Sequence, residues 1–160
     1  MWFFMNTCYL FSFISFVMFI ISFFQSFLRF NVFQANHLTF MVLTSIIYLF
    51  TETLVIFFFV GTGVSVKEYT HEHHLDTRFH KKSISIKMKV YPPLLLNILF
   101  MIILFILVGA VDTGHVARWV YEVYFIFCIG HFIYAKKIQN DCFRTNTENI
   151  LTMSGIKPNF

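Results

Sequence analysis

The chain has 160 residues, of which 58% are hydrophobic and only 12% are charged, with a formal net charge of +4. Soluble domains average about 45–50% apolar and about 25% charged residues. The composition therefore excludes an ordinary soluble enzyme domain and a disordered chain, and it predicts an integral membrane protein with a single domain, residues 1–160. We expect the lipid bilayer as a partner. We expect no nucleic acid, because the excess of Lys and Arg over Asp and Glu is explained by the orientation of the chain in a membrane.

Four apolar runs follow one another, and each approaches the ~20 residues that a helix needs to cross a bilayer. They cover residues 2–28, 38–60, 94–111 and 119–135. Runs this continuous are typical of membrane helices rather than barrel strands, in which apolar and polar residues alternate. Short connections after the first and third runs predict antiparallel neighbours. We therefore expect an all-α integral membrane fold, a four-transmembrane-helix up-down bundle.

Lys and Arg are divided unequally between the segments outside these runs. Segment 61–92, which we predict to be a histidine-rich basic loop, and the tail 136–160 carry ten of the twelve, and Arg29 and Arg118 are the other two. Cytoplasmic segments of membrane proteins are enriched in Lys and Arg. We expect both termini, the loop and the tail on the cytoplasmic side of a bacterial inner membrane, or on the matrix side of the mitochondrial inner membrane.

Two motifs are expected to interrupt the helices at the ends of this loop. Gly61-Thr62-Gly63 either ends the second span or allows close packing, and Tyr91-Pro92-Pro93 precedes the third. Residues 83–91 alternate polar and apolar side chains, which is typical of a strand. The same residues could instead begin the third helix in amphipathic form.

Small residues recur along one face of the first run. They are Cys8, Ser12, Ser15, Ser22 and Ser26. Small side chains let helices approach closely in lipid, so this pattern predicts a packing seam suited to helix partners. The three cysteines lack C-x-x-C spacing and predict no disulfide framework.

Glu52 lies within the second run, one helical turn from Tyr48. A bare carboxylate in the hydrocarbon costs at least ~2.5 kcal/mol, so Glu52 must carry a proton or have a partner. His131 is the histidine clearly inside a span, in the fourth run. Glu52, Tyr48 and His131 are therefore candidates for a proton or ion site, and the alternative is a neutral acid that hydrogen-bonds a neighbouring helix.

Histidine ligands for haem b or for a metal are the sharper chemical hypothesis. His131 is the candidate inside the bundle, while His37, His115 and Asp112 lie at the outer ends of the spans. Haem b needs inward-facing imidazoles, and a rim metal site would need all three outer residues to meet. The overall layout resembles small cytochrome-b anchor subunits in architecture alone, because no ligand motif of such subunits is present.

The predicted loop holds the densest histidine cluster. If the segment is helical, His73, Asp76 and His80 share one face, and imidazole with carboxylate suits Zn²⁺. Leu75 stands where the second histidine of H-E-x-x-H would fall, which excludes that metalloprotease motif. The alternative is a solvated basic loop beside anionic lipid.

No nucleophile elbow, phosphate-binding loop or spaced carboxylate pair occurs in the sequence, so we expect no enzyme. The sequence favours a small non-catalytic membrane protein that serves as an accessory or anchor subunit of a larger, respiratory membrane complex. Its protein partners would be other membrane subunits or further copies of the same chain. The alternative is a redox or ion-handling protein that binds haem b or a divalent metal, with Glu52 and His131 in the bundle.

Overall fold

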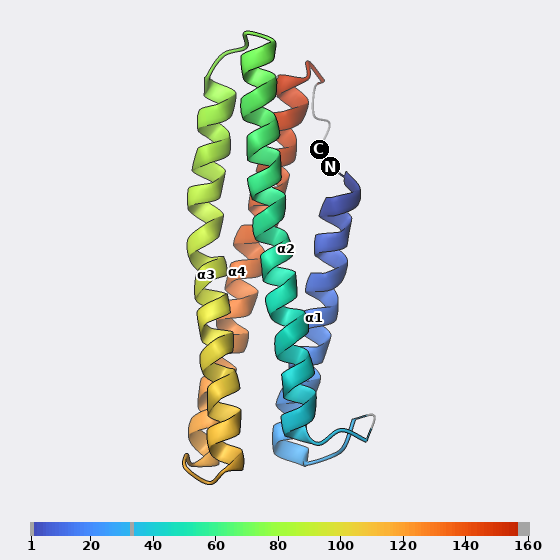
Figure 1. Cartoon of the computed structure of the whole chain (residues 1–160), viewed down its shortest axis with the longest axis vertical. Coiled ribbons are helices and arrows are strands. Elements are labelled where there is room, and N and C mark those ends of the chain that lie inside the picture. Colours follow the sequence, from blue (N-terminus) through green and yellow to red (C-terminus); the bar gives the residue numbers. More distant parts are fainter. Residues whose placement is uncertain (1, 33, 157–160) are drawn as a thin grey trace.

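The computed structural model describes residues 2–32 and 34–156, which form four helices and no sheet. They are α1 (Trp2–Leu28), α2 (His37–Glu72), α3 (Arg78–Asp112) and α4 (Arg118–Met153). Figure 1 shows them side by side along the long axis of the molecule. The expected all-α class is confirmed.

Three of the helices, α1, α2 and α3, are long and apolar enough to cross a membrane, and this identifies a membrane protein. The fourth predicted span, 119–135, is helical but belongs to a helix that does not reach this level of hydropathy. Glu122, His131 and several tyrosines lower the average of α4.

The predicted loop 61–92 is not a loop. Helix α2 continues to Glu72 and α3 begins at Arg78, so only residues 73–77 connect them. Residues 83–91 are part of α3 and form no strand. The predicted tail is also helical as far as Met153. At about 1.5 Å per residue, α2 is about 54 Å long against ~30 Å of hydrocarbon, so it is longer than a span requires. We call the helical segments beyond the predicted spans, residues 61–72, 78–91 and 136–153, the stalk.

Packing explains why neither expected interruption ends a helix. Gly63 has no Cβ, and the side chain of Lys87 occupies the space that a Cβ would take. Pro92 and Pro93 remove two backbone hydrogen bonds inside α3. Val90 and Leu94 on either side of them are fully buried, so tertiary contacts hold the helix through the two prolines. Of the two alternatives for the glycines, close packing is the one observed.

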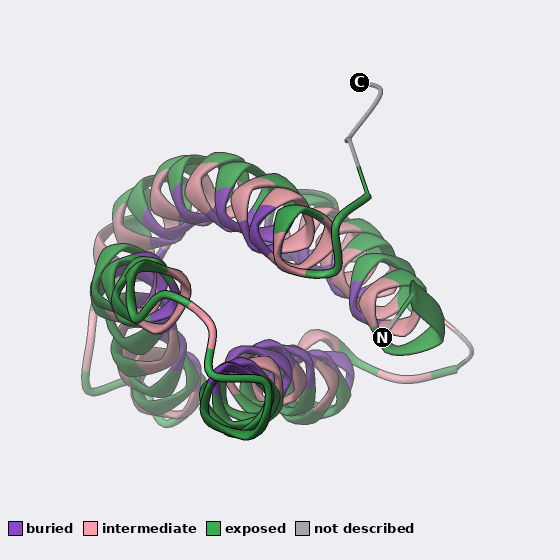
Figure 2. Cartoon of the chain, turned by 90° about the horizontal axis from the view of Figure 1, so that it is seen from above, coloured by how far each residue is buried: buried purple, intermediate pink, exposed green. Residues whose placement is uncertain are grey.

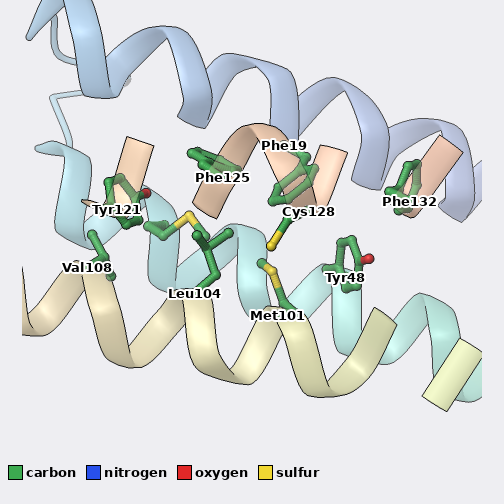
Figure 3. Packing of buried hydrophobic residues seen from close by; sticks show 10 residues of the cluster. Phe19, Tyr48, Met101, Leu104, Val108, Tyr121, Phe125, Cys128 and Phe132 are labelled. Carbon is green, nitrogen blue, oxygen red and sulfur yellow. The ribbon is translucent and has the colours of Figure 1, made fainter. Parts of the chain in front are cut away.

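Buried residues lie on the helix sides that face one another, as the coloured ribbon in Figure 2 shows from above. One cluster fills the part of the bundle away from the stalk, and Figure 3 shows its aromatic and sulfur-containing side chains. It comprises Phe19, Met41, Tyr48, Met101, Leu104, Val108, Tyr121, Phe125, Cys128 and Phe132. A second cluster, which includes Cys8, Phe59, Val90 and Phe143, joins the bundle to the stalk.

The predicted small-residue seam of α1 packs against α2. Ser15 Oγ lies 2.7 Å from Thr51 Oγ1, and Ser22 Oγ lies 2.9 Å from Thr44 Oγ1. All four residues are buried. Each threonine also donates to the carbonyl four residues before it in α2. The seam is thus occupied within the chain and is not available to a partner helix.

Replacing Ser22 with leucine is expected to force α1 away from α2, because the extra volume has no space at this contact. Overpacking of this kind costs about 1–3 kcal/mol. We expect the S22L protein to unfold at a lower temperature than the parent in the same detergent. S85L, the same change at an exposed position of α3, is the control, and an equal loss of stability in both variants would contradict the seam.

The stalk predicts strong protection of backbone amides in both halves of segment 61–92. Hydrogen exchange measured by mass spectrometry in nanodiscs should be slow in residues 64–72 and 82–91 and fast in 73–77. Uniformly fast exchange across 61–92 is the result expected of a loop and would exclude the stalk.

Candidate functional site

A buried ion pair joins α2 to α4 in the middle of the bundle. Lys136 Nζ lies 3.0 Å from Glu52 Oε1, and the Glu52 side chain is fully buried. Lys136 follows the predicted fourth span directly, but a long helical side chain points toward the N-terminus of its helix, which here is into the bundle. Glu52 therefore has the partner that its position in the hydrocarbon requires.

The ammonium of Lys136 also makes hydrogen bonds inside the protein. Besides its ion pair with Glu52, it donates to Gln139 Oε1 at 2.8 Å and to Ser12 Oγ at 3.3 Å. Its nitrogen also lies 5.1 Å from the centroid of the Phe132 ring. The cation is held by groups from α1, α2 and α4.

Asn97 of α3 links Glu52 to His131. Its Nδ2 donates to Glu52 Oε1 at 3.3 Å, and its Oδ1 lies 2.6 Å from His131 Nδ1. Because an amide oxygen can only accept, the second bond places a proton on Nδ1 of His131. The polar network, defined as Ser12, Glu52, Asn97, His131, Lys136 and Gln139, thus takes members from all four helices.

Sequence reasoning identified Glu52 and His131 but missed the residues that connect them. Asn97, Lys136 and Gln139 were assigned no role in the site, yet Asn97 and Gln139 are almost completely buried. One signal was present: Gln139 continues the spacing of the buried positions Cys128, Phe132 and Ala135 in α4. Tyr48 is buried beside Glu52, and its ring packs against those of Phe19 and Phe132.

The candidates for a rim metal site do not come together. His37 Nε2 lies 2.9 Å from the Tyr121 hydroxyl, and His115 Nδ1 lies 2.9 Å from Thr113 Oγ1. His37 and Asp112 line a cavity of about 450 Å³ at this end of the bundle, but His115 does not. Within residues 2–32 and 34–156, no group of three or more His, Cys, Asp or Glu side chains could hold a metal ion.

The candidates in the predicted loop do not lie on one continuous helix. Residues 73–77 connect α2 to α3, so the condition for a shared face of His73, Asp76 and His80, a helical segment, is not met. Asp76 instead accepts from the backbone N–H of Arg78 at 2.8 Å and pairs with its guanidinium. The His73 ring lies against the Tyr69 ring, with 4.2 Å between centroids.

Burial changes the acidity of two groups in the stalk. Burial lowers the pKa of Lys87, whose side chain lies across Gly63. Burial also raises the pKa of the Cys142 thiol, an effect that Lys89 opposes and Asp141 reinforces. A thiol with a raised pKa holds little thiolate at neutral pH, so Cys142 is a packing residue of the stalk.

The polar network can hold charge and protons inside the bundle. One carboxylate and one ammonium compensate each other, and Asn97 and His131 supply further hydrogen bonds. One polar atom remains: Glu52 Oε2 is buried without a hydrogen-bond partner among the described residues.

Comparison with known proteins does not extend this interpretation: no protein-family model, curated protein or solved structure matches the chain.

The ion pair predicts strong coupling between Glu52 and Lys136. Removing one member of a buried pair costs about 3–5 kcal/mol, because the other charge is left without compensation. We expect K136M alone to be strongly destabilised, and E52Q/K136M to recover a large part of the loss. Unfolding of E52Q, K136M and the double variant in one detergent measures the coupling. Simple additivity of the two single changes would contradict the pair.

Proposed function

We propose that the chain is a small non-catalytic integral membrane protein that serves as an accessory or anchor subunit of a larger membrane complex. In this proposal all four helices cross an inner membrane in an up-down bundle, and both termini and the stalk are cytoplasmic. The observation that carries the proposal is the stalk itself. Three helices continue together beyond the predicted spans and offer a folded surface to a partner.

Exposed side chains support a membrane span in α4, although its average hydropathy is lower. In residues 118–134 of α4, six large hydrophobic side chains are exposed. They are Trp119, Val123, Ile126, Phe127, Ile133 and Tyr134. His131 is turned toward Asn97 of α3. The surface of this segment is therefore suited to lipid, and its polar groups contribute to contacts inside the protein.

Charge on the stalk supports a cytoplasmic docking surface. Residues 78–91 of α3 include five cations and no acid: Arg78, Lys81, Lys82, Lys87 and Lys89. All but Lys87 are exposed. Lys and Arg beside membrane spans favour the cytoplasmic side, and a positive helix surface is complementary to an acidic partner.

Gentle solubilisation from native membranes tests the proposal. We expect a tagged chain to be isolated in an assembly well above its own 19.0 kDa, with stoichiometric partner subunits. The charge-reversal variant K81E/K82E should lose the partners while remaining folded in the membrane. R29E, a single charge reversal on the opposite side of the predicted bundle, is the control. A folded monomer without partners in native membranes would overturn the proposal.

A second function is favoured by one atom, the unpartnered Glu52 Oε2 inside the bundle. A buried carboxylate oxygen without a partner is a place where a proton can bind, with Tyr48 and His131 nearby as further members of a proton site. This proposal predicts proton flux in proteoliposomes that E52Q abolishes. Equal flux for E52Q and the parent protein would exclude it, provided that both proteins have the same helical content.

A further inference from the structure

A groove separates α1 from α4 on the outer surface of the bundle. These two helices contact each other over fewer residues than the pairs α1–α2, α2–α3 and α3–α4. The space between them has a volume of about 430 Å³. This volume lies within the ~300–1,000 Å³ typical of sites for small ligands.

The two ends of the groove differ in chemistry. Phe13, Phe16, Phe132 and Ile133 form an apolar part, in which the Phe16 and Phe132 rings stack with 5.8 Å between centroids. Phe13 and Ile133 are exposed. Toward the stalk, the lining becomes polar and consists of Tyr9, Ser12, Lys136, Lys137, Gln139 and Asn140. An occupant of this groove must therefore have an apolar body and a polar head.

Lys137 is the cation that remains free at the polar end. The neighbouring Lys136 is neutralised by Glu52 and donates hydrogen bonds to Gln139 and Ser12. Lys137 is exposed, and no carboxylate of the described residues lies within ion-pair distance of it. Asn140 Oδ1 accepts from the Tyr9 hydroxyl at 2.7 Å, which leaves the Asn140 amide N–H groups as donors. The polar end thus presents a positive charge and hydrogen-bond donors, which suit an anion.

We propose that this groove binds one anionic phospholipid of the adjacent leaflet. The phosphate lies against Lys137 and the Asn140 amide, and an acyl chain runs along Phe13, Phe16 and Ile133. The position of the groove supports a lipid as the occupant, because the predicted span 119–135 ends just before Lys137, whose long side chain can reach the headgroups. Charge selects the headgroup, since a net-neutral lipid gains little from the lysine. The proposal goes beyond the accessory role and does not require any protein partner.

Native mass spectrometry of the purified full chain tests the proposal, with phosphatidylglycerol and phosphatidylcholine as probes. We expect one phosphatidylglycerol per chain to be retained and phosphatidylcholine to be lost. A lysine near an anionic lipid contributes about fivefold in affinity. K137Q should therefore weaken phosphatidylglycerol binding about fivefold, and K137R should restore it.

K89Q is the matched control, because it removes an equivalent exposed charge from α3, outside the groove lining. I133W tests the apolar end, since a larger side chain there should fill the groove and reduce retention of the lipid. Both groove variants leave the Glu52–Lys136 pair intact, so their melting temperatures should match that of the parent. Equal retention of the two lipids, or equal effects of K137Q and K89Q, would show general attraction to the membrane surface and overturn the site.

Discussion

The salt bridge between Glu52 and Lys136 is the interaction on which the arrangement of the bundle depends. Neither charge is tolerated alone in hydrocarbon, so each requires the other. Their contact fixes the depth of α4 relative to α2, and the bond from Asn97 to Glu52 does the same for α3. Ser12 brings α1 to the same point. Apolar packing alone specifies depth poorly in lipid, because many positions of similar helices have similar energies. One polar network shared by four helices removes that ambiguity.

The stalk follows from the same packing rules as the bundle. Each of α2, α3 and α4 continues beyond its predicted span with buried residues at helical spacing, such as Val66, Ile86 and Phe143. Helix α1 packs beside the first part of the α4 stalk segment, where the Tyr9 hydroxyl donates to Asn140 and Met5 contacts Thr147. Beyond the start of α1, three helices continue (Figure 1), which leaves a surface for solvent or for a partner, as the proposed accessory role requires.

Ion handling and accessory binding make different demands on the same network. A structural network is most effective when all of its groups are paired, whereas a proton site needs an atom that can change its partner. The other five residues of the network have partners, as a structural network requires, whereas Glu52 Oε2 has none among the described residues and could serve as a proton site. Measurements on E52Q separate the two, because a structural role changes stability and a proton site changes flux. The lipid groove adjoins this network, because Ser12, Lys136 and Gln139 also line it, but Lys137 takes no part in the network.

The sequence by itself determined the membrane class, the helical fold and the requirement that Glu52 find a partner, because each depends on local composition and on the cost of placing charge in lipid. Tertiary structure decided what local signals cannot. Lys136 has the sequence pattern of a boundary lysine, and only the side-by-side placement of α2 and α4 makes it the partner of Glu52. Gly63, Pro92 and Pro93 have the pattern of helix ends, but contacts from neighbouring helices keep α2 and α3 continuous through them. The seam of α1 could serve any helix, and the fold assigns it to α2. In each case the deciding energy comes from residues distant in the chain, and no single segment contains that information.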